Sequence, residues 1–333
     1  MSTRVAINGL GRIGRAILKG IIDEPTLELV AINDLADVEN LAYLLRFDTV
    51  YGRYPKPVGI EEGELVVAGR KLRTLSSRDP STLPWKDLRI ELVFECTGAH
   101  TRREDLEKHV RAGARFVLLS APSKDEDVET LVHGANVAGS TSGIISCASC
   151  TTNCITPIVE VIGRRIGFSK AAMTTVHAYT SSQSIVDGPS KRFRRGRAAS
   201  ANLVPATTGA ALATTRALPE YANRFDGIAI RAPIPVGSIA DLTFVAARTT
   251  NVDEVNRILT EEAASKRYAG VLGVSHDPLV SSDIIGDPRA SVIDLELTKV
   301  IDGDLIKIMS WYDNEWGYAH QMLRAALALI GAP

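Results

Sequence analysis

The sequence Arg4-Val5-Ala6-Ile7-Asn8-Gly9-Leu10-Gly11-Arg12-Ile13-Gly14 decides how the first half of the chain folds. Its first five residues read as a buried strand, and its three glycines have the spacing G-x-G-x-x-G at the start of a helical pattern. In that context Gly9 permits a tight turn, Gly11 lets the backbone approach a pyrophosphate, and Gly14 allows the helix to pack closely on the strand. The helix N-terminus then favours the negative charge. We therefore predict a dinucleotide-binding turn.

An acidic residue stands where such a turn requires one. The next strand-like run, residues 28–33, leads to Asp34, twenty residues after Gly14. A carboxylate at this distance can accept hydrogen bonds from an adenosine ribose. A glycine turn with a solvated aspartate is the plainer interpretation, but it does not account for the complete order of strand, turn, helix, strand and acid. The order predicts NAD as cofactor, although the acid alone does not exclude NADP.

Further segments of the first half extend the same sheet. Residues 92–95 and 116–119 are short apolar runs separated by a helical stretch at 103–112, as in parallel strands buried on both faces. Their carboxyl ends would bring Thr97 and Ser120 to the edge that carries the glycine turn. Arg78 could reach this edge from its loop, although a solvated arginine is the ordinary interpretation. We predict a Rossmann-type doubly wound parallel sheet with helices, including one at residues 37–47, and an antiparallel hairpin over residues 51–71.

The second half of the chain has a different pattern. Strand-like segments recur with little helical signal between them, which indicates a largely antiparallel sheet in an α+β domain. These segments are residues 172–179, 226–234, 239–248 and 291–312 with a turn at 302–303; helical periods occur at 252–265 and 321–330. We predict a dinucleotide-binding domain at residues 1–149, associated with a C-terminal helix at 315–333, and a catalytic domain at 150–314.

A cysteine stands between the two halves in a setting that suits a nucleophile. The small residues 146–154 run into an apolar segment, residues 155–166, which reads as a helix and puts Cys150 at its N-terminus. Exposed N–H groups and the helix dipole there favour the thiolate. The strand-like residues 172–180 deliver His177, the base that such a cysteine needs. A lone cysteine in such a loop would usually be interpreted as a half-buried packing residue. The presence of His177 favours a catalytic role for Cys150 instead.

Composition limits the partners and the compartment. The chain has 333 residues, 45% of them apolar, and a formal net charge of −1, so small molecules are expected as partners rather than nucleic acid or a membrane. Four cysteines suit a reducing cytoplasm, and we expect no signal peptide or membrane span. Cys147-x-x-Cys150 and Cys96-x3-His100 could suggest a redox pair or a zinc site, but no second close pair of ligands has zinc-like spacing, so no metal is expected. The basic segment 191–197 is taken to frame anions or a subunit contact rather than nucleic acid.

The chain resembles phosphorylating glyceraldehyde-3-phosphate dehydrogenase over nearly its whole length. The resemblance rests on residues 7–15, 148–154, 174–180 and 310–318. It implies oxidation of D-glyceraldehyde 3-phosphate to 1,3-bisphosphoglycerate with NAD and inorganic phosphate, reversibly, in a homotetramer. The catalytic residues it implies are Cys150, as nucleophile and thioester carrier, and His177, as base.

The resemblance also assigns binding residues. For the cofactor it implies Arg12, Ile13, Asp34, Arg78, Ser120 and Asn314, beside the glycines and Thr97 named above. For the phosphate sites it implies Ser149, Thr151, Thr208, Gly209 and Arg195, with Thr180 and Arg231 holding the phosphate of the substrate. The chain departs from the common pattern at Leu10, Cys147, Ile234 and residues 319–321.

Three alternatives remain open at this point. Erythrose-4-phosphate dehydrogenase is a sister family with the same cysteine and histidine but different phosphate contacts. A cysteine acyltransferase or hydrolase would use the nucleophile without a redox cofactor, which the dinucleotide fingerprint argues against. A nucleotide- or RNA-binding role through the basic segment would be a second function. Capture of oxidised Cys150 by Cys147 or Cys154 as a disulfide is a separate regulatory hypothesis.

Overall fold

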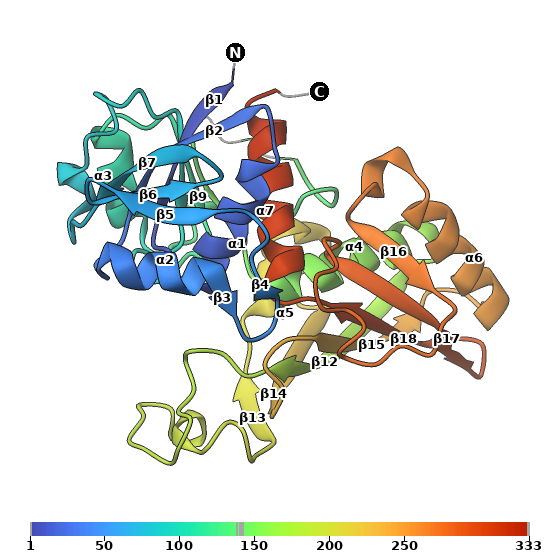
Figure 1. Ribbon diagram of the computed structural model, residues 1–333. Helices are drawn as coiled ribbons and strands as arrows, with labels where there is room; N and C mark the ends of the chain where they lie inside the picture. Colours follow the sequence, from blue (N-terminus) through green and yellow to red (C-terminus); the bar gives the residue numbers. More distant parts are fainter. Residues whose placement is uncertain (1, 138, 140–142, 332–333) are drawn as a thin grey trace. The chain divides into compact units, whose positions relative to one another are not determined.

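The computed structural model describes residues 2–137, 139 and 143–331 (Figure 1). The chain divides into two compact units. The first holds the described residues of Met1–Leu131, Val137–Ala148 and Met322–Pro333, and the second those of Val132–Asn136 and Ser149–Gln321. The division falls beside the predicted boundary between residues 149 and 150, but the domain assignment itself stays a prediction.

A nine-stranded sheet forms the first unit. Its order is β10-β11-β9-β8-β1-β2-β7-β6-β5, and Figure 1 shows β5, β6 and β7 side by side at one edge. The central strand β1 is paired in parallel with both β2 and β8, so the strand order reverses at β1, where ligands bind in doubly wound sheets. The strands are β1 (Thr3–Asn8), β2 (Leu27–Asn33), β5 (Val58–Glu61), β6 (Glu64–Val67), β7 (Arg70–Leu75), β8 (Leu92–Glu95), β9 (Phe116–Leu119), β10 (Glu129–Thr130) and β11 (Ile144–Ser146).

The helices of this unit follow the apolar periodicity of the sequence. They are α1 (Arg12–Ile22), α2 (Val38–Arg46) and α3 (Arg103–Arg111), and a short pair, β3 (Phe47–Asp48) and β4 (Gly52–Arg53), lies outside the main sheet. The predicted parallel sheet and its helices are confirmed. The predicted hairpin over 51–71 is also confirmed as β5, β6 and β7, although β7 in addition joins β2 in parallel.

A seven-stranded sheet forms the second unit, in the order β13-β14-β12-β15-β18-β17-β16. Most neighbours are antiparallel, as predicted, but β12 pairs in parallel with β14 and β16 with β17. The strands are β12 (Phe168–Ala178), β13 (Val204–Thr207), β14 (Phe225–Ala232), β15 (Ser238–Ala246), β16 (Leu272–Ser275), β17 (Ser291–Ile301) and β18 (Leu305–Tyr312). The predicted turn at 302–303 connects β17 and β18.

Helices α4 (Cys150–Arg165), α5 (Ala210–Ala217) and α6 (Val252–Ala263) belong to the second unit, and their apolar residues share one core with the strands (Figure 1). Helix α4 starts at Cys150, five residues before the apolar run that predicted it, because Ser149 caps it: the Ser149 hydroxyl accepts from the Thr152 N–H. Helix α7 (Trp316–Leu329) begins in the second unit and ends in the first.

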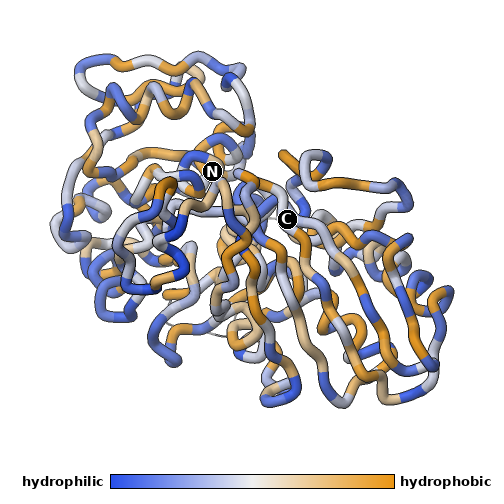
Figure 2. The backbone as a smooth tube through the Cα atoms, turned by 90° about the horizontal axis from the view of Figure 1, so that it is seen from below, coloured by the Kyte–Doolittle hydropathy of each residue, from blue (hydrophilic) through white to orange (hydrophobic). Residues whose placement is uncertain are grey.

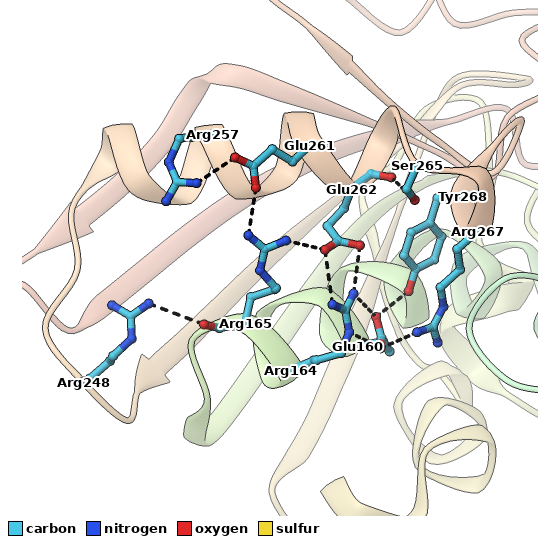
Figure 3. A network of polar contacts seen from close by, with 10 residues as sticks. All are labelled: Glu160, Arg164, Arg165, Arg248, Arg257, Glu261, Glu262, Ser265, Arg267 and Tyr268. Atoms are coloured by element: carbon cyan, nitrogen blue, oxygen red, sulfur yellow. Dashed lines mark hydrogen bonds and ion pairs between the residues drawn. The ribbon is translucent and has the colours of Figure 1, made fainter.

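Polar contacts between charged groups join the C-terminal turn of α4 to α6 and to the segment that follows α6 (Figure 3). Arg164 bonds to both Glu160 and Glu262, and the Tyr268 hydroxyl donates to Glu160 at 2.5 Å. Arg165 adds a second partner to Glu262. We refer to these five residues as the α4–α6 network.

The hydropathy of the chain agrees with this arrangement of strands, helices and loops. The strands carry most of the hydrophobic segments, and the hydrophilic ones lie mostly at turns and loops (Figure 2). Within the described residues, every helix is too short or too polar to cross a membrane.

Candidate active site

A cavity of about 470 Å³ opens at the carboxyl edge of the first sheet, beside the glycine turn. It lies where β1, β2 and β8 end, which is the position predicted for a dinucleotide. The residues that line it are Asn8, Gly9, Gly11, Asn33, Asp34, Leu35, Ser77, Arg78, Cys96, Thr97, Ala99 and His100. Five predicted cofactor residues are therefore brought together: Gly9, Gly11, Asp34, Arg78 and Thr97.

The glycine turn has the geometry that its sequence demands. Gly9 has φ +92°, and a Cβ there would lie 2.7 Å from the Thr97 nitrogen. A Cβ on Gly14 would lie 2.0 Å from the Gly9 oxygen, so side chains are excluded at both positions. A Cβ on Gly11, by contrast, would meet nothing within 4 Å, because this residue faces open space at the N-terminus of α1. The turn is thus closed on its inner side and open where a pyrophosphate would approach.

Asp34 is held by the turn itself. One carboxylate oxygen accepts from the Leu10 N–H at 2.6 Å and the other from the Ala36 N–H at 2.9 Å. Each oxygen keeps further lone pairs for a ribose hydroxyl. The residues at this edge therefore fit a dinucleotide: a glycine turn open to solvent, the N-terminus of α1, and a positioned carboxylate.

Other predicted cofactor residues lie near this edge without lining the cavity. The Arg12 side chain forms an ion pair with Asp48 and lies over the Tyr51 ring. Ile13 is half-buried in the first turn of α1, and the Ser120 N–H donates to the Glu95 carbonyl. The roles assigned to these residues stay predictions.

Sequence reasoning missed a buried polar chain beneath the cavity. Asn33 donates to the Asn8 side chain at 2.7 Å, and Asn8 donates in turn to Glu95. Glu95 also accepts from His109, and Trp85 donates to the other ring nitrogen of His109. The motif Val93-Phe94-Glu95 offered the only signal, an acid inside an apolar strand, which must find donors when buried.

In the second unit, the two predicted catalytic side chains meet. Cys150 is the first residue of α4, and His177 is the next-to-last residue of β12. The Cys150 Sγ lies 3.3 Å from the His177 Nε2. The other ring nitrogen, Nδ1, lies 2.6 Å from the Ala178 carbonyl oxygen. A nucleophile, a base and an orienting group are thus in contact, which is the arrangement of a nucleophilic thiol.

Burial shifts the pKa values of both side chains of this pair. Burial raises the pKa of the Cys150 thiol, and the nearby Arg231 charge, the Thr151 hydroxyl and the helix N–H groups lower it without outweighing burial. Burial and the Arg231 charge lower the pKa of His177 to about 3. Burial of the thiol therefore opposes the thiolate that the helix N-terminus favours, and it outweighs the helix contribution.

Two guanidinium groups gather beside the pair. The Arg231 Nη1 lies 2.7 Å from the His177 Nδ1 and 3.1 Å from the Ala178 oxygen. Arg195 donates to the Ser182 hydroxyl at 2.6 Å, and this hydroxyl bonds to that of Thr180. Burial and the repulsion of Arg231 lower the pKa of Arg195. Like charges placed together in this way favour an anion between or beside them.

Ser182 and Tyr312 were not predicted as site residues. Ser182 connects Thr180 to Arg195, and Tyr312 holds the hydroxyls of Thr151 at 2.9 Å and Thr175 at 2.8 Å. Ser182 lies two residues after Thr180, just beyond the predicted strand at residues 172–180, so its nearness to the site could have been inferred from the sequence. Tyr312 lies 161 residues from Thr151 and carries no such signal.

The remaining predicted residues of the second unit lie at helix starts and strand ends. Ser149 caps α4, Gly209 precedes α5, and the Thr208 hydroxyl accepts from the Ala210 N–H. The Thr151 hydroxyl bonds to Tyr312 rather than lying open. The Asn314 side-chain oxygen accepts from the Gly237 N–H and the Ser238 hydroxyl. Their phosphate and cofactor roles stay predictions.

Metal ligands do not gather in the part of the chain that the structure describes: no group of three His, Cys, Asp or Glu side chains is placed to hold an ion.

The doubly wound sheet with its open glycine turn, together with a second unit that pairs a cysteine with a histidine, defines an NAD-dependent oxidoreductase. Comparison with known families makes the class specific. Residues 3–103 match the glyceraldehyde 3-phosphate dehydrogenase NAD binding domain, and residues 149–314 match the C-terminal domain of the same enzymes. The chain belongs to the glyceraldehyde-3-phosphate dehydrogenase family and is an NAD-dependent enzyme of that family.

Curated relatives agree over almost the full length. The chain is 45% identical over 332 residues to the glyceraldehyde-3-phosphate dehydrogenase of Mycobacterium tuberculosis, covering 97% of each chain. It is 44% identical over 327 residues to the Streptomyces coelicolor enzyme, again covering 97% of each. With the Zymomonas mobilis enzyme the identity is 43% over 330 residues and 98% of each chain. The predicted family, the enzyme class and NAD as cofactor are confirmed.

Proposed function

We propose that this chain oxidises D-glyceraldehyde 3-phosphate to 1,3-bisphosphoglycerate with inorganic phosphate, reversibly, through a thioester on Cys150. The observation that carries the proposal is the 3.3 Å contact between the Cys150 Sγ and the His177 Nε2, at the N-terminus of α4 and beside two guanidinium groups. A thiol with a base can attack an aldehyde, and the guanidiniums suit a substrate that carries phosphate.

The chemistry proceeds in two halves. His177 takes the thiol proton, the sulfur attacks the aldehyde carbon, and the N–H groups at the start of α4 stabilise the oxygen on which charge develops. NAD, when bound, supplies the hydride acceptor for the oxidation that leaves a thioester. During that oxidation His177 accepts the hydroxyl proton. Inorganic phosphate then attacks the thioester carbon, the carbon–sulfur bond breaks, and the sulfur leaves as thiolate.

Different residues bind the phosphate group of the substrate and the inorganic phosphate. Arg231 and Thr180 hold the phosphate of the substrate, while Arg195, Thr208, Gly209, Ser149 and Thr151 serve inorganic phosphate. The link from Thr180 through Ser182 to Arg195 brings the two groups of donors next to each other, as two neighbouring phosphate sites require. For the cofactor we propose Gly9, Gly11, Gly14, Asp34, Arg78 and Thr97 at the cavity edge, with Arg12, Ile13, Ser120 and Asn314 as further contacts.

Turnover with and without inorganic phosphate tests the reaction. Reduced nicotinamide is followed by absorbance with glyceraldehyde 3-phosphate and NAD, and the pair is repeated with erythrose 4-phosphate and with NADP. Steady turnover that requires phosphate and prefers the triose supports the proposal. Turnover independent of phosphate would refute the thioester phosphorolysis, and a preference for the tetrose would select the sister activity.

We further propose that the chain works as a homotetramer in the cytoplasm. One face of the second sheet carries alternate half-buried side chains, among them Val176, Ile239, Val245, Met309 and Trp311, together with the ion pair of Asp241 and Lys307. Large half-buried apolar side chains on such a face suit an interface in an assembly. All four cysteines are free, as in a reducing compartment. Light scattering after gel filtration should give four times the chain mass, and a monomer would contradict the assembly.

A further inference from the structure

Ser238, the first residue of β15, bridges the last residue of β12 and the segment that follows β18. Its hydroxyl oxygen accepts from the Ala178 N–H at 3.1 Å, and its proton is donated to the Asn314 Oδ1 at 3.0 Å. Ser238 and both of its partners are buried, so neither bond competes with bulk water. One hydroxyl thus connects two strands on either side of its own.

The contacts at β15 also fix which way the Asn314 amide is turned. The Gly237 N–H, which can only donate, lies 3.2 Å from Oδ1, so the amide oxygen faces Gly237 and Ser238. The amide nitrogen, Nδ2, lies on the other side and makes no hydrogen bond within the part of the chain that the structure describes. Its two N–H donors are therefore available to a carbonyl oxygen, and the carboxamide of a nicotinamide ring carries one.

The other end of the bridge reaches the histidine of the site. Ala178, whose N–H is held by Ser238, places its carbonyl oxygen 2.6 Å from the His177 Nδ1, and the Arg231 Nη1 donates to the same oxygen at 3.1 Å. The position of this oxygen sets the rotation of the imidazole, and with it the direction in which Nε2 faces the Cys150 Sγ at 3.3 Å. A shift of the Ala178 backbone would turn the base away from the thiol.

We propose that Ser238 is a positioning residue that holds the base His177 and the cofactor contact Asn314 in one fixed relation. Oxidation of the aldehyde adduct removes a hydride from the carbon and a proton from its oxygen, so the groups that receive them must be aligned on the same carbon–oxygen bond. This role rests on the proposed function, which takes His177 as the base and Asn314 as a contact of the cofactor. Ser238 acts through Ala178 and Asn314 rather than on the reacting atoms.

The sheet itself does not depend on this hydroxyl. Backbone pairing holds β15 on both sides, and Ile239, the residue after Ser238, is opposite both Val176 of β12 and Trp311 of β18. Ser238→Ala keeps this pairing and removes only the hydroxyl. The substitution therefore leaves the strand in place and releases the two groups that the hydroxyl holds.

Two ligands that differ only at the nicotinamide end test the link to the cofactor. ADP-ribose has every part of NAD except the nicotinamide ring, and calorimetric titration of the full chain gives the affinity for each. We expect Ser238→Ala to bind NAD about fivefold more weakly than the wild type and to bind ADP-ribose equally well. A merely structural role would weaken the binding of both ligands alike, so an unchanged ratio of the two affinities would overturn the proposal.

The reaction of Cys150 with iodoacetamide, at one fixed pH and without cofactor, tests the link to the base. Ser238→Ala should react about threefold more slowly than the wild type, because His177 is no longer held against the thiol. Ser291→Ala is the matched control: this serine is buried in the same sheet, its hydroxyl bonds to that of Ser310, and the variant should react like the wild type. Equal rates for the two serine variants would show that Ser238 does not position the base.

Asn314→Ala separates this role from the proposed function. If Asn314→Ala binds NAD and ADP-ribose as the wild type does, Asn314 is not a contact of the cofactor, and that part of the proposed function fails together with the role of Ser238. If Asn314→Ala weakens the binding of NAD alone while Ser238→Ala weakens the binding of neither ligand, only the positioning role of Ser238 is wrong.

Discussion

Trp85 donates its indole N–H to Nδ1 of His109 at 2.9 Å, and an indole can only donate, so the ring proton of the neutral imidazole lies on Nε2. That nitrogen is 3.1 Å from the Glu95 carboxylate, which also accepts from the Asn8 side chain and from the Thr97 N–H. Trp85, His109 and Glu95 have no exposed surface. A buried carboxylate thus gathers donors from three segments, two of which line the dinucleotide cavity.

Glu95→Gln should therefore weaken both the first unit and its cofactor binding. An amide replaces one acceptor oxygen by a donor, so at least one of the converging donors loses its partner, at a cost of about 1–3 kcal/mol. Asn8 and Thr97 then lose their fixed positions at the cavity. We expect a lower denaturant midpoint and a several-fold weaker NAD affinity by calorimetric titration. Glu107→Gln, a half-exposed acid on α3, is the matched control, and equal affinities for the two variants would refute the positioning role.

Gly11 and Gly14 offer a matched pair of substitutions in one turn. Gly14→Ala places a Cβ 2.0 Å from the Gly9 oxygen, so the helix must shift and the unit should lose about 1–3 kcal/mol of stability. Gly11→Ala meets no atom within 4 Å and should unfold like the wild type. Its methyl group nevertheless stands where the backbone approaches a pyrophosphate, so NAD affinity should fall about tenfold. Undiminished NAD binding by Gly11→Ala would show that the pyrophosphate lies elsewhere.

Cys150→Ser should abolish turnover and leave NAD binding nearly intact. A serine hydroxyl is a far weaker nucleophile, and its base His177 is the same. Steady-state rates and NAD titration of the purified variant give the comparison. A variant that keeps even about a tenth of the wild-type rate would contradict the assignment of Cys150.

The pH dependence of Cys150 in the ligand-free protein follows from the same site. Because burial raises the pKa of the thiol above its ordinary 9.0, its alkylation by iodoacetamide should still increase with pH beyond 9.0. His177 has its pKa lowered to about 3, so the histidine adds no inflection near neutral pH. Cys147 and Cys154, whose pKa values burial raises to about 12, contribute little to the rate. An alkylation rate that already levels off near neutral pH would show that Cys150 is a thiolate in the ligand-free protein despite its burial.

Sequence reasoning succeeded where a local pattern carries the physics. The glycine turn, Asp34 and the apolar strands of the first unit follow from spacing and periodicity alone. The position of Cys150 at a helix start also follows, since small and hydroxyl residues precede an apolar run. Helix α5 and strand β13 were missed because each is short, and their small residues give little amphipathic signal.

The contacts that set the chemistry depend on tertiary register instead. Arg231 faces His177 only because β14 lies parallel to β12, 54 residues along the chain. The sequences of β12 and β14 do not reveal that the two strands are paired in parallel. The effect of burial on Cys150 was missed for the same reason: the helix terminus is local and readable in the sequence, whereas burial of the thiol arises from packing. The family resemblance identified the site residues, whereas the charges and burial around them are visible only in the folded structure.

The α4–α6 network should contribute to the stability of the second unit (Figure 3). Glu160 is one-tenth exposed and accepts from Arg164, Arg267 and the Tyr268 hydroxyl. Tyr268→Phe removes one hydrogen bond and should cost about 1 kcal/mol. Glu160→Ala leaves the buried Tyr268 hydroxyl without its acceptor and removes one acceptor each from Arg164 and Arg267, which keep others, so we expect a larger loss, about 2 kcal/mol after allowance for the partly exposed arginines. Urea denaturation compares the two, and equal losses would show that the carboxylate adds nothing.

The pH dependence of this stability has a definite sign. Burial alone would raise the pKa of Glu262, but its bonds and charge contacts with Arg164 and Arg165 outweigh burial and hold the pKa below the ordinary 4.5. The folded chain therefore binds fewer protons than the unfolded chain near that pH, and the stabilisation, present above 4.5, is lost as pH falls through the folded value. Glu262→Gln should be less stable than the wild type at neutral pH and should lose less stability on acidification below 4.5, because the amide cannot titrate. Parallel stability curves for the two proteins on acidification would mean that Glu262 titrates alike in the folded and unfolded chains, and that its bonds to α4 do not stabilise the charged form.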